Sequence, residues 1–488
     1  PNILFCISDD QSYAHTGANG DPVVKTPAFD RVAREGVLFM NAFVPSPGCS
    51  PSRASMLTGR HTWQIEHAGT HASEFPKKYH VYPELLERNG YFVGSTGKSW
   101  GPGNWKISGR DRNPAGPDFN KRNAKPPHGG IRKTDYAANF KDFLDARPDG
   151  KPFCFWYGAS EPHRSFEKGV GLKIGKKLAD AKVPSFLPDS PEIRSDLLDY
   201  CVEIEWFDKH LGRMLQLLED AGELENTLVI VTSDNGMAFP RAKANCFEYG
   251  IHVPLAVRWP KQVPSGRVVK DLVSLTDLAP TLLEAAETKL PAEPAMSGKS
   301  FLSVLRSSEQ GQVDPARTRA FSARERHSSS RWNNLAYPQR AMRTPTHLYS
   351  RNFKPDRWPA GTPRKLEGSK LGPLHGGYHD IDACPSLTLL IQNRSNPNVR
   401  PLFLWWVDKR PGEELYDIET DPGCLKNLAL DDSHAKVLAE LRKECDAYLR
   451  KTGDPRALGT GDVFESYKRY SRIRKFPKPE PGVRVAPD

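Results

Sequence analysis

Carboxylates and an amide directly follow two apolar runs that have the length of buried strands. Asp9-Asp10 come after residues 2–8, and Asp234-Asn235-Gly236 come after residues 227–233. In an open parallel sheet, functional sites lie beyond the carboxyl ends of the strands, so both groups are expected at one edge. Three carboxylates there repel one another unless a cation lies between them, and oxygen ligands suit Ca²⁺ or Mg²⁺. Either group alone is more simply a helix cap or a turn.

The segment 48–60 reads GCSPSRASMLTGR and has the form of a loop that enters a helix. Pro51 and Ser52 suit a helix start. A helix N-terminus carries partial positive charge and free N–H groups, so it stabilises an anion at Cys49. Arg53 lies one turn further on and could bridge to residue 49 or to a bound oxyanion through its planar fork of donors. The simpler interpretation is a free thiol at a helix cap. With this segment beside them, the carboxylates favour a metal site.

Three more polar side chains are predicted at the same edge of the sheet. Lys98 follows the apolar run 91–96, His163 follows the run 152–159, and Lys243 follows the Asp-Asn-Gly turn by a few residues. Alone, each would be interpreted as a surface residue. Together with Arg53 they would stabilise the charge on a transferring anionic group. His163 could also protonate a leaving oxygen or nitrogen.

Alternating strand and helix patterns must position these residues. Short apolar runs bounded by Gly, Pro or Asp indicate buried strands of a mostly parallel sheet; they are residues 2–8, 91–96, 152–159, 227–233 and 255–259. Apolar residues at helical spacing predict helices over 26–35, 83–88 and 196–221. Residues 99–135, rich in Gly, Pro and Asn, indicate a long loop that covers the sheet edge or forms a rim of the site. The alternation predicts an α/β doubly wound core.

The pattern changes after about residue 335. Strand-like pieces occur at 339–343, 347–351, 402–406 and 413–417, and a helical stretch follows at 433–449. These predict a smaller antiparallel sheet with a helix packed on it. A chain of 488 residues is too long for one ordinary core. We therefore divide it into a catalytic α/β domain, 1–335, and a C-terminal α+β subdomain, 336–488.

The charge and the motif content of the chain indicate which classes of binding partner to expect. The net charge is +10, which is either a solvated basic surface or a field that attracts an anionic substrate. No nucleic-acid partner is expected, because no zinc-finger, helix-turn-helix or RNA-recognition signature is present. No membrane span is expected either, because no apolar run approaches the ~20 residues that one needs. The eight cysteines contain no CxxC pair, so a structural zinc site is not expected, and disulfides among Cys384, Cys424 and Cys445 stay open.

The Cys49 segment fits the C-x-P-S-R-x-x-x-L-T-G signature, and the chain resembles the type I sulfatases of the alkaline phosphatase-like superfamily. The resemblance is close over about residues 1–260. It implies that an enzyme converts Cys49 to formylglycine, whose hydrate attacks sulfur. It also implies one Ca²⁺ bound by Asp9, Asp10, Asp234 and Asn235 together with residue 49. The sulfate-binding and polarising residues that it implies are Arg53, Lys98, His163 and Lys243.

One position departs from the family pattern. Many sulfatases have Gly-Lys-x-His where this chain has Gly97-Lys98-Ser99-Trp100. An indole N–H is only a donor, so Trp100 cannot shuttle a proton, although it could donate to a sulfate oxygen or stack on a sugar. Arg326 and His327 could line a substrate subsite, but a solvated loop is an equally good interpretation.

Within the family, the chain most resembles sulfamidases, through Glu161-Pro162-His163-Arg164 and the run 337–343. Sulfamidases carry Arg where Lys243 stands, so this chain keeps the positive charge but lacks the planar fork of donors that a guanidinium provides. The substrate that the resemblance implies is a sulfated saccharide, with N-sulfoglucosamine as the first candidate. The alternatives are an O-sulfatase for another glycan or an aryl sulfate, a phosphonate or phosphodiester hydrolase, and a catalytically silent glycan-binding protein. The resemblance also implies maturation by a formylglycine-generating enzyme, export from the cytoplasm or lysosomal placement, and allows a homodimer.

Overall fold

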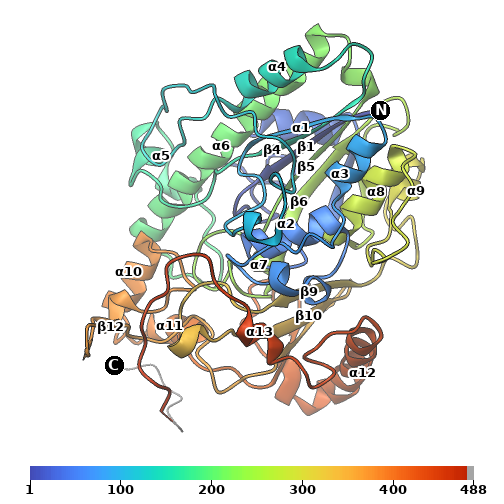
Figure 1. Cartoon of the computed structure of the whole chain (residues 1–488). Helices are drawn as coiled ribbons and strands as arrows, with labels where there is room; N and C mark the ends of the chain where they lie inside the picture. Colours follow the sequence, from blue (N-terminus) through green and yellow to red (C-terminus); the bar gives the residue numbers. More distant parts are fainter. Residues whose placement is uncertain (481–488) are drawn as a thin grey trace.

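A large twisted sheet forms the centre of the molecule. The structure, a computed structural model, describes residues 1–480 (Figure 1). The strand order is β3-β4-β1-β5-β6-β2-β7, with β8 also paired to β2. The bounds are β1 Asn2–Ser8, β2 Val37–Phe43, β3 Phe92–Gly97, β4 Phe153–Gly158, β5 Thr227–Ser233, β6 His252–Arg258, β7 Arg267–Val269 and β8 Val273–Ser274. Only β6 runs against its neighbours β5 and β2, so the predicted mostly parallel sheet is confirmed.

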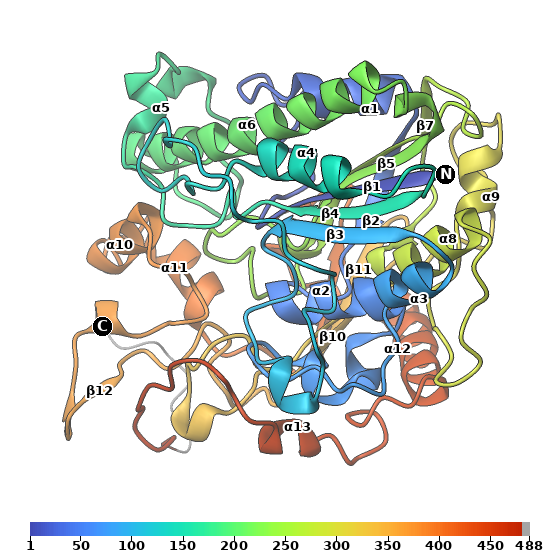
Figure 2. The ribbon, with the colours of Figure 1, turned by 45° about the horizontal axis from the view of Figure 1, so that its top comes forward.

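Helices cover both faces of this sheet, which explains why its strands are continuous apolar runs. Every residue of β1, β4 and β5 is buried. In Figure 2, α1 (Pro27–Arg34), α4 (Tyr136–Ala146) and α6 (Pro191–Asp220) lie on one side of the sheet. On the other side lie α2 (Cys49–Thr58), α3 (Tyr82–Arg88), α8 (Leu278–Ala285) and α9 (Leu302–Arg306). The sheet is therefore the middle layer of an α/β sandwich, as predicted.

The long loop 99–135 runs along the outer edge of β3. The Ser95 N–H donates to the Pro117 carbonyl at 2.8 Å, and the Phe119 N–H donates to the Ser95 carbonyl at 2.7 Å. These bonds satisfy backbone groups that an edge strand would otherwise expose. The loop thus covers the sheet edge, the first of its two predicted roles.

A smaller antiparallel sheet has the order β14-β11-β10-β9. Its strands are β9 Ala320–Arg324, β10 Gln339–Arg343, β11 His347–Asn352 and β14 Glu413–Asp417. The helix α12 (Ala435–Lys451) packs on it through Leu438, Leu441 and Cys445. The sheet takes β9 from before residue 335, where the sequence pattern changes. The other elements are α5 Val170–Lys173, α7 Glu248–Ile251, α10 Pro385–Gln392, α11 Arg400–Val407, α13 Val463–Ser466, β12 Leu366–Glu367 and β13 Lys370–Leu371.

The strand predicted at 402–406 is wrong, because this segment forms α11. The six consecutive apolar residues 402–407 fit a buried strand and a helix equally well by hydrophobicity alone. In the structure, Phe403, Trp406 and Val407 are the buried residues of α11, and their spacing is that of one helical face. They pack with α10 and α6 in a single apolar cluster.

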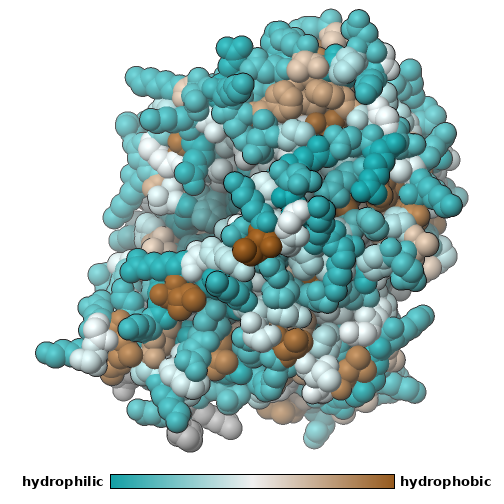
Figure 3. All heavy atoms as spheres, viewed as in Figure 1, coloured by the Kyte–Doolittle hydropathy of each residue, from teal (hydrophilic) through white to brown (hydrophobic). Residues whose placement is uncertain are grey.

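Other global features are simple. All eight cysteines are buried and unpaired, so the disulfides left open above do not form. Within residues 1–480, no helix is both long enough and apolar enough to cross a bilayer. On the face drawn in Figure 3, hydrophilic residues predominate and hydrophobic ones are scattered in small groups.

Candidate active site

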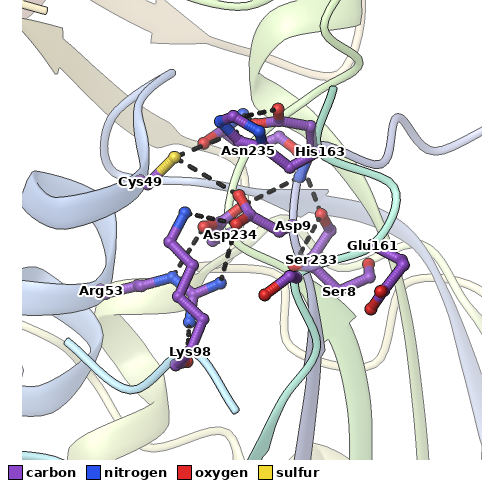
Figure 4. Close-up of polar contacts among 12 residues, drawn as sticks. Ser8, Asp9, Cys49, Arg53, Lys98, Glu161, His163, Ser233, Asp234 and Asn235 are labelled. Carbon is purple, nitrogen blue, oxygen red and sulfur yellow. Dashed lines mark hydrogen bonds and ion pairs between the residues drawn. The ribbon is translucent and has the colours of Figure 1, made fainter. Parts of the chain in front are cut away.

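The structure brings three carboxylates and a thiol together where β1 and β5 end. Oxygen atoms of Asp9, Asp10 and Asp234 and the Sγ of Cys49 all lie within 4.8 Å of one another, and all four side chains are buried. Because β1 and β5 are paired neighbours in register, their carboxyl ends must meet at this edge. Figure 4 shows Cys49, Lys98 and Arg53 pointing toward Asp9 and Asp234 from one side.

Backbone contacts fix the two acidic segments against each other. The Asp10 N–H donates to Oδ1 of Asp234 at 3.1 Å, and the Asp234 N–H donates to the Ser8 carbonyl at 3.1 Å. The Asp9 N–H donates to the Glu161 carbonyl at 3.0 Å, which joins the segment that follows β4 to the site. Asp10 has a φ of 76°, in the left-handed region that residues other than Gly seldom adopt. Such strain is characteristic of functional sites.

Asn235 and the crowded carboxylates fit a hard divalent cation. Nδ2 of Asn235 donates to Oδ1 of Asp10 at 2.7 Å. Its Oδ1 is buried without a hydrogen-bond partner among the described residues, although buried acceptors are normally satisfied. Burial and the neighbouring Asp9 raise the pKa of Asp234 to about 6 and outweigh the opposite effect of Arg53, so the negative charge here is only partly compensated. A cation held by these oxygens would remove both defects.

Cys49 is the first residue of α2, which begins after Gly48. Its thiol donates to Oδ1 of Asp9 at 3.4 Å. Burial, reinforced by Asp9, raises the pKa of this thiol well above its ordinary value. The thiolate is the nucleophilic form of cysteine. An unmodified Cys49 is therefore a neutral thiol and a poor nucleophile.

Arg53 lies one helical turn after Cys49 and is completely buried. Its Nε donates to Oδ2 of Asp234 at 2.7 Å, and its Nη1 donates to the Lys98 carbonyl at 2.5 Å and to the Ser99 carbonyl at 3.1 Å. Burial lowers its pKa, but Asp234 and Asp9 outweigh this effect and raise the pKa overall. Arg53 therefore joins α2 to the acidic cluster and to the loop after β3.

Two lysine ammonium groups balance the acidic cluster. Lys98 forms a short ion pair with Asp9, and the Nζ of Lys243 lies 2.7 Å from Oδ2 of Asp10. Burial raises the pKa of Asp9, but Lys98 and His163 hold it below its usual range. Burial lowers the pKa of Lys243, yet Asp10 and a further carboxylate, Asp382, raise it overall. Both lysines are therefore charged beside the acids.

His163 lies at the more open side of the site. Its Nε2 is 3.9 Å from Oδ2 of Asp10, and its Nδ1 lies 2.6 Å from the Arg164 carbonyl. A carbonyl can only accept, which assigns the proton to Nδ1 and leaves Nε2 toward the site. Its side chain is 35% exposed, whereas that of Asp10 is 0% exposed. His163 can therefore meet the part of a substrate that extends toward solvent.

Asp382 belongs to this site but was missed from the sequence. It comes from the segment before α10, and its Oδ2 lies 2.9 Å from the Nζ of Lys243. Oxygens of Asp382 and Asp10 and a nitrogen of His163 lie within 4.8 Å of one another. No strand end or motif precedes Asp382, so the sequence contains no signal for it.

Trp100 and Arg326 do not occupy the predicted substrate-contacting positions. Trp100 is 3% exposed, and its indole N–H donates to the Ser50 carbonyl at 3.0 Å. It therefore supports the first turn of α2 from behind and has no face free for a sugar. Arg326 is 3% exposed and donates to the Tyr467 carbonyl at 2.7 Å. Its guanidinium fastens the C-terminal segment instead of lining a subsite.

His327 lies next to Cys49, together with a histidine that the sequence did not suggest. A Cβ at Gly48 would come 3.0 Å from Cδ2 of His327, so a side chain at this position would crowd the ring. The His327 ring lies 4.9 Å from that of His71, and its Nδ1 is 3.5 Å from a carboxylate oxygen of Asp380. Burial lowers the pKa of both histidines, so both are neutral near pH 7. Only His327 of the predicted pair Arg326 and His327 is near residue 49.

Comparisons with known proteins agree with this geometry. The family model described as Sulfatase matches residues 1–288, more than half of the chain. The chain is 28% identical to human N-sulphoglucosamine sulphohydrolase, with 95% of this chain and 93% of that protein covered. It is 27% identical to an ulvan-active sulfatase of Formosa agariphila, over 95% of this chain and 77% of the relative.

A solved structure in complex with its substrate, D-glucosamine-2-N,6-O-disulfate, shares the fold. Its TM-score is 0.64 at 19% identity, and the alignment covers 93% of this chain and 99% of that one. The matched family region, residues 1–288, contains the acidic cluster, Cys49 and both lysines. The chain belongs to the sulfatase family and is a hydrolase that acts on sulfate esters or sulfamates.

Proposed function

We propose that the protein removes sulfate from a sulfated saccharide with residue 49 in the formylglycine form. The observation that carries this proposal is the place of Cys49 within the acidic cluster, with its Sγ 3.4 Å from Asp9. A buried neutral thiol is a poor nucleophile, and sulfur is a poor ligand for a hard cation. A hydrated aldehyde would present oxygen at the same point, which suits both roles. Formylglycine would supply a hydroxyl nucleophile that can release sulfate and regenerate the aldehyde.

The proposed metal is one Ca²⁺ ion held by Asp9, Asp10, Asp234 and Asn235. The unpartnered Oδ1 of Asn235 and the mutual repulsion of the carboxylates support a cation of this kind. When bound, the ion would supply positive charge to polarise a sulfate oxygen. It would also neutralise the carboxylates that now pair with Lys98 and Lys243, so that these ammonium groups can turn toward the substrate.

The cationic residues and the histidine of the site would each have a separate role toward the substrate. Lys98 and Lys243 would bind sulfate oxygens and stabilise the negative charge that grows on them. Arg53 would hold α2, and with it residue 49, against Asp234. His163, protonated, would donate its Nε2 proton to the leaving oxygen or nitrogen, while its Nδ1–H stays on the Arg164 carbonyl.

A sulfated saccharide is the proposed substrate class. The names of the two relatives, an N-sulphoglucosamine sulphohydrolase and an ulvan-active sulfatase, support this class. The net charge of +10 favours encounter with an anionic glycan. N-sulfoglucosamine is our first candidate, and an O-sulfated sugar is the second. We also propose maturation by a formylglycine-generating enzyme and export or lysosomal placement, as the family resemblance implies. A homodimer is compatible with these proposals.

Mass spectrometry of the peptide that carries Cys49 tests the modification, in protein made with the converting enzyme. We expect conversion of the cysteine, and an unmodified thiol in active protein would refute the formylglycine proposal. Turnover of a sulfate ester, a sulfamate and a phosphodiester tests the reaction class, and a preference for the phosphodiester would refute it. Cys49→Ala should abolish turnover without changing the melting temperature.

A further inference from the structure

Asp382 places a negative charge on the open side of a site that is built for an anion. Its Oδ2 lies 2.9 Å from the Nζ of Lys243, and its side chain is 29% exposed. Among the site's acids, Asp9, Asp10 and Asp234 are 0–1% exposed. Asp382 is thus the carboxylate of this group that solvent, or the outer part of a substrate, can reach.

This placement is unfavourable for a simple sulfate ion. Like charges repel, and burial weakens the screening that water provides. Asp10 already lies 2.7 Å from the Nζ of Lys243, so Asp382 is the second carboxylate on a single ammonium group. Burial raises the pKa of Asp382, but Lys243 and His163 hold it below its usual range, so the carboxylate stays charged. A hydrogen-bond donor on the substrate would give this partly exposed carboxylate a role beyond its pairing with Lys243.

The two groups that flank Asp382 indicate which substrate atom it meets. The buried residues must hold the sulfate end, since a saccharide is too large to enter between them. The sugar must extend past the more exposed groups, His163 at 35% and Asp382 at 29%. The atom that links sulfur to the sugar therefore lies near His163, Lys243 and Asp382. A carboxylate accepts hydrogen bonds and donates none.

We propose that Asp382 accepts a hydrogen bond from the nitrogen of an amino sugar and so selects sulfamates over sulfate esters. This inference rests on the proposed function and concerns the same site. The linking nitrogen of a sulfamate carries one hydrogen, whereas the linking oxygen of an ester carries none. Hydrolysis adds one water, breaks the S–N bond and yields a dianionic sulfate and the sugar ammonium. The ammonium is a stronger partner for a carboxylate than the substrate N–H is.

Asp382→Asn tests the proposal, with Asp142→Asn as the matched control. Asp142 is 30% exposed and pairs with Arg122 at 2.8 Å, but it lies on α4, away from the site. Binding of glucosamine and of glucose to the calcium-loaded protein is measured by ligand-observed NMR. We expect the wild type and Asp142→Asn to prefer glucosamine at least about tenfold, and Asp382→Asn to lose most of this preference. An unchanged preference in Asp382→Asn, or none in the wild type, would overturn the proposal.

Kinetics supply the second measurement. The ratio of kcat/KM for N-sulfoglucosamine to that for an aryl sulfate should fall at least about tenfold in Asp382→Asn, because only the sulfamate loses a hydrogen bond. An equal loss on both substrates would instead mean that Asp382 merely positions Lys243. If the wild type hydrolyses neither substrate, the proposed function fails, while the glucosamine measurement still decides the role of Asp382.

Discussion

Replacing Trp100 by Phe tests whether this residue supports α2 or contacts the substrate. The change removes the indole N–H that donates to the Ser50 carbonyl at 3.0 Å. It also replaces two fused rings by one in a side chain that is only 3% exposed. The lost hydrogen bond costs about 1 kcal/mol, since the carbonyl keeps its helical partner. The partial void costs about 1–2 kcal/mol more. We expect the free energy of unfolding to fall by about 2–3 kcal/mol.

The kinetic effect follows from the position of Ser50 beside Cys49. A shift of the first turn of α2 moves the nucleophile, and a misplacement of about 1 Å costs up to about 100-fold in rate. We therefore expect kcat on a sulfate ester to fall about 10- to 100-fold with little change in KM. Urea unfolding and steady-state kinetics measure the two effects.

Trp406 provides a matched control for Trp100. It is 1% exposed, and its indole N–H donates to the Phe186 carbonyl at 3.0 Å, but it lies in α11. Trp406→Phe should cause a similar loss of stability and leave kcat unchanged. If Trp100→Phe raises KM while stability and kcat stay at wild-type values, Trp100 contacts the substrate and our reasoning is refuted.

Three further predictions concern charged groups. Burial raises the pKa of Glu203 to about 9. The stability that the protonated carboxyl contributes is therefore fully present below the ordinary pKa of glutamate and is lost as pH rises through about 9. From pH 5 to pH 8, the free energy of unfolding of Glu203→Gln should therefore rise by about 1–3 kcal/mol relative to that of the wild type, as measured by urea unfolding. A difference that does not change with pH would contradict this. Chelation should lower the melting temperature and calcium restore it, with about 2.7 kcal/mol of stabilisation at 100 times Kd. The rise in melting temperature with calcium should be smaller in Asp234→Asn. A melting temperature that does not change with calcium would exclude the metal site. Arg53→Lys should cost about 2–3 kcal/mol, because one ammonium cannot hold both Asp234 and two carbonyls; a melting temperature equal to that of the wild type would disprove this.

Continuous apolar strands are the part of this fold that the sequence predicts best. The bounds predicted for β1 and β5, 2–8 and 227–233, agree with the structure. Helices cover both faces of the sheet, so each of these two strands is one apolar run, and each is followed directly by an aspartate. The prediction for α11 is wrong because an uninterrupted apolar run fits a buried helix as well as a buried strand. The strand β2 was missed, although five of its seven residues are buried, because Asn41 interrupts its apolar run.

The buried half of the site could be predicted, because the ends of parallel strands meet at one edge. Asp9 and Asp234 are neighbours for this reason, although they are far apart in the chain. Cys49 and Lys98 carry their own motif signals. Trp100 was considered as a donor to a sulfate oxygen or a stacking partner for a sugar, but its indole N–H bonds the Ser50 carbonyl. A motif fixes the position of a residue in the chain and not the direction of its side chain.

Asp382 could not be predicted because its position depends on contacts between distant loops. Two residues earlier, the buried Asp380 bonds Arg324 and Arg331, each at 2.6 Å. Burial raises the pKa of Asp380, but these two guanidinium groups hold it well below its ordinary value. Breaking such a buried ionic group by removing one partner costs about 3–5 kcal/mol, so the segment that carries Asp382 has little freedom. Arg324 ends β9 of the smaller sheet, and that sheet therefore sets the open wall of the site while the large sheet sets its floor. In our proposal, sulfate chemistry and sugar selection therefore rest on different parts of the fold, and the two parts meet where Asp382 pairs with Lys243.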